Sequence, residues 1–207
     1  MNSCVFCQRS LNAKMSISFI FSFKKVRENQ LCEKCRKKFQ LIDPKNHCPG
    51  CSLEQLNQKF CEECLRWEEE FPNLELNHNA LFTYNEMAQE FMSKFKHQGD
   101  LILAEAFSKE LYERLAPFQK SHIILPVPSS RQDKNDRGFN STELLLDRAG
   151  ITYYQLLESD NWKKIDKNKI LIVDDIYKSG RKILNIRAIL EEDLNGIHEI
   201  RSFSLFR

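Results

Sequence analysis

The chain has 207 residues, which is enough for one sizeable domain and a smaller one. Its 42% hydrophobic and 29% charged residues are typical of a folded globular protein and exclude a disordered one. The formal net charge of +2 excludes a protein that binds polyanions through a large overall charge.

The start of the chain shows no targeting pattern. The sequence "MNSCVFCQRS" has neither a basic region nor an apolar run, so we expect no signal peptide and a cytoplasmic protein. The apolar run "MSISFIFSF" at 15–23 alternates like a strand and has about half the length that crosses a bilayer. We therefore expect no membrane insertion.

All eight cysteines fall before residue 65, and each belongs to a C-x-x-C pair. The pairs are Cys4/Cys7, Cys32/Cys35, Cys48/Cys51 and Cys61/Cys64. The rest of the chain contains no cysteine. This change in composition predicts a small cysteine-rich domain at 1–65 and a second domain at 66–207.

Each C-x-x-C pair can supply two thiolates to one tetrahedral zinc ion, so the four pairs predict two structural zinc sites. The uniform spacing and the absence of a leader favour zinc over a disulfide framework. The nine-residue gap between Cys51 and Cys61 suits a ribbon loop and favours pairing in sequential order. A cross-braced arrangement, in which the first pair joins the third and the second joins the fourth, is the alternative.

Basic and aromatic residues are interleaved around the second cysteine pair. The basic residues are Lys24, Lys25, Arg27, Lys34, Arg36, Lys37 and Lys38, and the aromatic residues are Phe19, Phe21, Phe23 and Phe39. Such a mixture is typical of surfaces that bind single-stranded nucleic acid. Alternatively, the phenylalanines form the core of the domain and the lysines keep its surface soluble.

Strands and helices alternate after the cysteine-rich segment. Runs of branched apolar residues predict strands, and amphipathic periodicity predicts helices. The predicted strands are 80–85, 122–128, 151–157, 169–175 and 198–207, and the predicted helices are 86–99, 101–118, 141–150 and 179–192. This alternation predicts an α/β fold with a parallel, doubly wound sheet.

Two adjacent aspartates, Asp174 and Asp175, end the most apolar predicted strand. A carboxylate is costly to bury without a partner, so this pair must face solvent or a ligand. The loop that follows contains Gly180 and leads into a helix, and backbone N–H groups in such a place can bind a phosphate. The sequence thus predicts a sugar-phosphate site; alternatively, Asp175 caps a turn and Asp174 faces water.

Several short motifs together resemble a known family. They are the C-x-x-C pairs, "ALFTYN", "FKHQGD", "LPVPSS", "DRGFNS", "ILIVDDIYKSG" and "SFSLFR". The chain resembles the phosphoribosyltransferases over essentially its whole length, and it is most similar to their ComF branch of competence proteins. The resemblance implies a phosphoribosyltransferase-like α/β domain preceded by a double zinc ribbon.

The resemblance also implies roles for individual residues toward phosphoribosyl pyrophosphate (PRPP). Asp174 and Asp175 would hold the ribose hydroxyls. The loop residues Lys178, Ser179, Gly180, Arg181 and Lys182 would surround the 5-phosphate. Lys96, Arg131 and Arg137 would lie on the pyrophosphate side, together with Mg²⁺.

The sequence departs from the family pattern in three places. The loop reads K-S-G-R-K where phosphoribosyltransferases have T-T-G-x-T, and Ser141 stands where ComF proteins usually have glutamine. The stretch 158–169 is shorter than the corresponding part of other members, which includes a mobile cover for the site.

The resemblance implies a protein that supports natural transformation, with a phosphoribosyl ligand, single-stranded DNA and other competence proteins as partners. The alternative is an active phosphoribosyltransferase that moves ribose 5-phosphate from PRPP to a nitrogenous base. Closing covers exclude water from reactive intermediates, so the short 158–169 stretch leaves open whether the chain is an enzyme.

Overall fold

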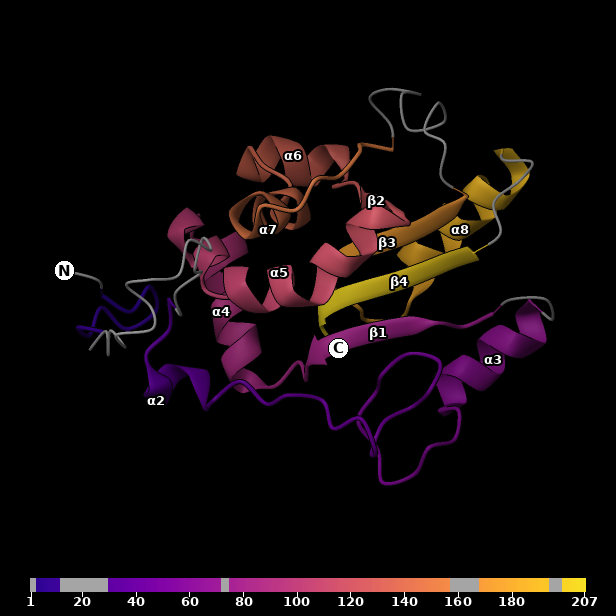
Figure 1. Cartoon of the computed structure of the whole chain (residues 1–207), viewed down its shortest axis with the longest axis horizontal. Coiled ribbons are helices and arrows are strands. Elements are labelled where there is room, and N and C mark those ends of the chain that lie inside the picture. Colours follow the sequence, from indigo (N-terminus) through magenta and orange to yellow (C-terminus); the bar gives the residue numbers. More distant parts are fainter. Residues whose placement is uncertain (1–2, 12–29, 72–74, 157–167, 194–198) are drawn as a thin grey trace.

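Four strands form one parallel sheet in the computed structural model, which describes residues 3–11, 30–71, 75–156, 168–193 and 199–207 (Figure 1). The strands are β1 (His78–Phe82), β2 (Ile123–Pro126), β3 (Lys169–Ile176) and β4 (Glu199–Phe206). Their order in the sheet is β1-β4-β3-β2, and every neighbouring pair is parallel. The parallel α/β class predicted from the sequence is confirmed.

Helices lie on both sides of this sheet (Figure 1). The α-helices are α2 (Glu33–Arg36), α3 (Glu62–Glu70), α4 (Glu86–Lys96), α5 (Ser108–Leu115), α6 (Arg131–Arg137), α7 (Ser141–Ala149) and α8 (Arg181–Asp193), and the 3-10 helices are η1 (Leu101–Glu105) and η2 (Ala116–Lys120). Asparagine side chains cap α4 and α7: Asn85 accepts from the N–H of Ala88, and Asn140 accepts from that of Thr142. These caps replace hydrogen bonds that the first turn of a helix lacks.

Side chains along β3 alternate between the two faces of the sheet, as the pleat requires. Leu171 and Val173 belong to a buried cluster with residues of α4, α5 and α7, which we call the α5 face. Ile170 and Ile172 belong to a second cluster with residues of α8, which we call the α8 face. Because both faces are covered, β3 reads as an unbroken apolar run in the sequence.

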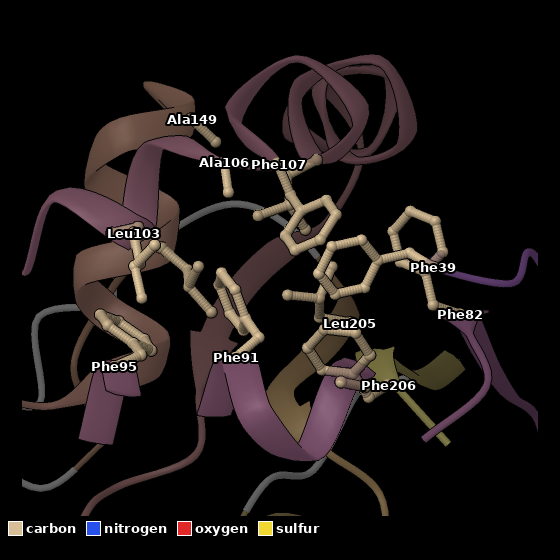
Figure 2. Close-up of a cluster of buried hydrophobic side chains, with 14 of the residues drawn as sticks. Phe39, Phe82, Phe91, Phe95, Leu103, Ala106, Phe107, Ala149, Leu205 and Phe206 are labelled. Atoms are coloured by element: carbon tan, nitrogen blue, oxygen red, sulfur yellow. The ribbon is translucent and has the colours of Figure 1, made fainter. Parts of the chain in front are cut away.

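The α5 face contains a cluster of phenylalanines with Phe39 among them (Figure 2). The Phe39 ring lies 4.8 Å from that of Phe107 and 5.9 Å from that of Phe91, measured between ring centroids. The rings of Phe82 and Phe206 are 6.1 and 6.2 Å away. Phe39 is 3% exposed, so the expectation that it stacks on nucleic-acid bases is wrong, and the alternative of a core role holds for this residue.

The segment that carries Phe39 continues along the edge strand β1. The N–H of Ile42 donates to the carbonyl of Leu81 at 3.1 Å, and the N–H of Thr83 donates to the carbonyl of Gln40 at 2.9 Å. An uncovered edge strand exposes unpaired backbone groups. The cysteine-rich segment therefore covers part of this edge in addition to filling the core.

The two groups of cysteines lie on opposite faces of the sheet. Cys4 and Cys35 belong to the cluster of the α5 face, whereas Cys48, Cys51, Cys61 and Cys64 belong to that of the α8 face. The helix α3 begins directly after Cys61 and continues past residue 65, where we predicted a domain boundary. That division of the chain stays a prediction.

Several elements differ from the predictions. The expected strand at 151–157 is wrong: the described residues 151–156 contain no strand, and we find one backbone bond to β2, from the N–H of Tyr154 to the carbonyl of Ile124. The expected helix at 101–118 is divided into η1, α5 and η2. The helix α6 was not predicted, because its residues are all polar and carry no apolar periodicity. The predicted strand at 15–23 lies outside the described residues.

Replacing Phe39 tests whether the cysteine-rich segment is part of the central core. Because the ring is buried against those of Phe82, Phe91, Phe107 and Phe206, Phe39→Ala should lower the free energy of unfolding by about 3–5 kcal/mol in urea titrations. Leu56→Ala is the control: Leu56 is 96% exposed, and the change should cost less than about 0.5 kcal/mol. Equal effects of the two substitutions would contradict the described packing.

Candidate functional site

A cleft of about 720 Å³ opens at the carboxyl end of β3. Ligands of parallel α/β sheets bind beyond the carboxyl ends of the strands. The lining residues include Tyr84, Gln89, Lys96, His97, Asp133, Arg137, Asp174, Asp175, Tyr177, Lys178, Ser179, Gly180, Arg181 and Lys182. The structure thus brings together almost all of the residues that the sequence proposed as ligand contacts.

The acid pair lies at the base of this cleft with its charges partly compensated. Asp174 and Asp175 are 8% and 4% exposed, so neither simply faces water. The Lys96 ammonium lies 2.7 Å from Oδ2 of Asp175, and the Ser141 hydroxyl donates to the same oxygen. The backbone N–H of Asp175 donates to Oδ1 of Asp174 at 2.9 Å. Three elements, α4, α7 and β3, therefore converge on the pair.

Burial and, to a smaller extent, the neighbouring charge of Asp175 raise the pKa of Asp174 from 3.8 to about 7. The positive charges of Lys182 and Lys96 oppose this increase in pKa. Two carboxyl groups in a poorly solvated site cannot both ionise without cations nearby. A cationic or hydrogen-bond-donating ligand at the pair would replace part of the lost solvation.

The loop between β3 and α8 requires glycine at one position. Gly180 has φ +75°, and a Cβ atom there would lie 2.2 Å from the hydroxyl oxygen of Tyr177. A side chain at this position would therefore meet both backbone strain and a steric clash. The N–H groups at the start of α8, which has 13 residues, have no acceptors within the helix and carry partial positive charge.

Residues of α6 also line the cleft. The Arg137 guanidinium forms an ion pair with Asp133 at 2.8 Å, which holds it at the cleft but partly neutralises its charge. The hydroxyl of Ser130 donates to the carboxylate of Asp133 at 2.8 Å. Arg131 is the first residue of α6, and its side chain lies outside the described part of the structure.

The cysteines form two groups of four, and the sulfur atoms of each group lie within 4.8 Å of one another. The groups are Cys4, Cys7, Cys32 and Cys35, and Cys48, Cys51, Cys61 and Cys64. We call them the first and second cysteine sites. Sulfur pairs 3.6–3.7 Å apart match the edge of about 3.8 Å of a tetrahedron around zinc. Both sites fit zinc in the sequential arrangement that the sequence favoured.

Curated competence proteins are similar to this chain along its whole length. The chain is 30% identical to Competence protein ComFC of Streptococcus pneumoniae (strain ATCC BAA-255 / R6), and the alignment covers 99% of each protein. This chain belongs to the ComFC family of competence proteins. It is also 26% identical to Competence protein ComFC of Bacillus subtilis (strain 168), over 99% of this chain and 94% of that protein. No family model matches the chain.

Membership in the ComFC family confirms the resemblance to ComF proteins and supports a competence-related function. Within the described residues, we find no helix that is both long enough and apolar enough to span a bilayer.

Several residues that line the cleft of this ComFC-family chain were not predicted from the sequence. Tyr84 lies near the acid pair: burial raises the pKa of its hydroxyl, and the charge of Asp175 adds to the increase. His97 and Asp133 also line the cleft. Their polar character was visible in the sequence, but their place at the cleft depends on how α4 and α6 pack, which no local pattern gives.

Metal analysis tests the two cysteine sites of this ComFC-family protein. Because each group of sulfurs matches one tetrahedral ion, the protein should contain two equivalents of zinc per chain. Removal of zinc with a strong chelator should cause cooperative loss of structure, since both sites contribute to the central clusters. One equivalent or none in freshly purified protein would contradict this assignment.

The raised pKa of Asp174 predicts how stability depends on pH. The Asp174 carboxyl group keeps its proton up to about pH 7 in the native state but releases it near pH 4 in the unfolded chain. The protonated group therefore contributes its full stabilisation below pH 4, and this stabilisation is lost as the pH rises to about 7. Asp174→Asn removes the cost of the buried charge. The variant should therefore gain stability over wild type, on the order of 1–3 kcal/mol, between pH 4 and pH 8. Urea titrations at both pH values measure this difference, and a difference that does not change with pH would exclude the proposed burial.

Proposed function

We propose that this ComFC-family protein supports natural transformation and that its cleft binds PRPP or a closely related phosphoribosyl ligand. The observation that carries the proposal is the buried acid pair, which faces the Gly180 loop and the start of α8 in one cleft. The cleft volume of about 720 Å³ lies within the range of small-molecule sites.

The acid pair suits the ribose part of such a ligand. Two adjacent carboxylates can each accept hydrogen bonds from neighbouring hydroxyl groups, which a ribose ring presents in pairs. Lys96 and Ser141 keep the Asp175 carboxylate in place without occupying all of its acceptor positions. Among the residues that the structure describes, the Asp174 carboxyl group accepts one backbone hydrogen bond, so its remaining lone pairs are available to a ligand.

Positive groups on both walls of the cleft suit the phosphates. The start of α8, with Lys178, Arg181 and Lys182, would bind the 5-phosphate, because charge-assisted hydrogen bonds to phosphate are strong. Lys96 and Arg137 would lie on the pyrophosphate side. Mg²⁺ prefers carboxylate and phosphate oxygens, so it would bind between the acid pair and the pyrophosphate.

We further propose that the surface near the first cysteine site contacts single-stranded DNA. Lys34, Lys37 and Lys38 are exposed there, although Lys37 forms an ion pair with Glu33 at 2.6 Å. Arg36 does not belong to this surface, because it is half-buried and forms an ion pair with Glu110 at 2.7 Å. Among the other residues that the sequence suggested, Lys24, Lys25, Arg27, Phe19, Phe21 and Phe23 lie outside the described residues.

Calorimetry with PRPP and Mg²⁺ tests the cleft. The double variant Asp174→Asn, Asp175→Asn should bind at least about 100-fold more weakly than wild type, because it loses charge-assisted hydrogen bonds to the ribose. Asp147→Asn is the control, because Asp147 is an exposed residue of α7. The affinity of this variant for PRPP should equal that of wild type. Unchanged affinity in the double variant would contradict the ribose assignment.

Incubation of the wild-type protein with PRPP and nitrogenous bases distinguishes a binding site from an active phosphoribosyltransferase. A binding site should leave PRPP intact in the presence of purine and pyrimidine bases. Release of pyrophosphate that depends on one of these bases would show that transfer takes place and would replace the binding role with an enzymatic one.

Charge reversal tests the DNA contact. Lys34→Glu with Lys38→Glu should weaken binding to a fluorescent single-stranded oligonucleotide by about tenfold or more at low salt, and should flatten the dependence of affinity on salt. Lys45→Glu with Lys59→Glu changes the net charge equally at exposed positions near the second cysteine site and is the control. Equal losses in the two double variants would mean that overall charge, rather than this surface, attracts DNA.

A further inference from the structure

Arg207 connects the second cysteine site to the loop at the cleft. One nitrogen of its guanidinium, Nη2, donates to Sγ of Cys51 at 3.2 Å and lies 2.8 Å from a carboxylate oxygen of Glu63. The other terminal nitrogen, Nη1, donates to the carbonyl of Lys178 at 2.8 Å. The guanidinium carbon lies 4.9 Å from the centre of the Tyr177 ring. This side chain is largely buried, with 9% of it exposed; its contacts with Cys51 and Glu63 are partly buried, and its contact with the Lys178 carbonyl is exposed.

Trp67 makes a second connection to the same loop. Its indole N–H donates to the carbonyl of Ser179 at 3.0 Å. Trp67 belongs to α3, which also carries Glu63 and Cys64 and begins directly after Cys61. The second cysteine site therefore fixes the helix whose side chains contact the loop.

These contacts determine which way the loop amides face. A trans peptide is planar, and its N–H points opposite to its C=O. The structure contains no cis peptide bond among the described residues. Because the Lys178 carbonyl faces Arg207, the N–H of Ser179 points away from Arg207. Because the Ser179 carbonyl faces Trp67, the N–H of Gly180 points away from Trp67. Both amides are thus turned away from Arg207 and Trp67, and they belong to residues that line the cleft.

We propose that Arg207 and Trp67 are positioning residues, through which the second cysteine site holds the amides of Ser179 and Gly180 in the orientation that binds an anion. This inference rests on the proposed phosphoribosyl site. It assigns this role to the second cysteine site, in which Cys51 contacts Arg207 and from which α3 with Trp67 extends, and not to the first, whose buried cysteines pack on the α5 face. Occupancy of the second site by metal then sets the affinity of the cleft for phosphate groups.

Two conservative substitutions separate this role from general stability. Trp67→Phe keeps an aromatic ring but removes the indole donor. Arg207→Lys keeps a positive charge near Cys51, but a single ammonium cannot match the fork of the guanidinium, which contacts Cys51, Glu63 and Lys178 together. Arg201→Lys is the matched control. Arg201 lies near the start of β4 and forms an ion pair with Glu199, whereas Arg207 directly follows the end of the same strand.

The experiment measures three quantities for the full chain: zinc content, affinity for PRPP with Mg²⁺, and hydrogen–deuterium exchange of the segment 177–184 without ligand. The variants Trp67→Phe and Arg207→Lys should each keep two zinc ions. The amides of the segment 177–184 should exchange at least about fivefold faster than in wild type, because the loop loses an anchoring hydrogen bond. Their affinity for PRPP should fall about tenfold. Exchange in α5 and α7 should not change, and the control should match wild type.

Each result supports or overturns the inference. Unchanged exchange of the segment in both variants would show that Arg207 and Trp67 do not position the loop. Faster exchange with unchanged PRPP affinity would show that the orientation of these amides does not matter for binding. If Arg207→Lys loses zinc, Trp67→Phe, which touches no sulfur, decides the question. If wild type itself binds no PRPP, the proposed function is wrong, and the exchange measurement still shows whether the second cysteine site holds the loop.

Discussion

The buried pair Asp174 and Asp175 is the constraint on which the rest of the site depends. Each carboxylate loses solvation at the end of β3, and an uncompensated charge there would cost more than most single interactions in the fold contribute. Lys96 from α4, Ser141 from α7 and Lys182 from α8 supply the compensation. The helices that build the two faces of the sheet therefore end or begin at one cleft, which joins the hydrophobic core to the proposed ligand site.

The cysteine-rich segment is integrated into the same architecture. It contributes Phe39 to the α5 face, covers part of the edge strand β1 and places the second cysteine site against the α8 face. Small segments with little apolar surface need metal or a partner surface to be stable; this one packs on the sheet and has two cysteine sites that fit zinc. The same arrangement places α3 beside the loop at the cleft, where Trp67 can act on it. Under the proposed roles of Arg207 and Trp67, a metal at the second cysteine site would affect ligand binding without contacting the ligand.

The central part of the site could be predicted from sequence because its signals are local. The apolar run before Asp174 defines a buried strand, Gly180 marks a turn, and the uniform C-x-x-C spacing indicates metal binding. The rest depends on contacts between distant residues. Trp67 belongs to none of the motifs, and the motif "SFSLFR" that ends with Arg207 does not indicate what this side chain contacts; the contacts of Arg207 and Trp67 with the loop cross 29 and 112 positions of the chain. The polar helix α6 lacks periodicity, and the apolar stretch at 151–157 resembles a strand although its described part makes a single bond to the sheet.

A crystal structure of the full chain with PRPP and Mg²⁺ would test the central claim most directly. The account predicts ribose hydroxyls within hydrogen-bond distance of Asp174 and Asp175, and a 5-phosphate that accepts from the N–H groups of Ser179 and Gly180. Density for the ligand at any other surface, or an acid pair that contacts only Lys96 and Ser141 while the ligand is bound elsewhere, would contradict it.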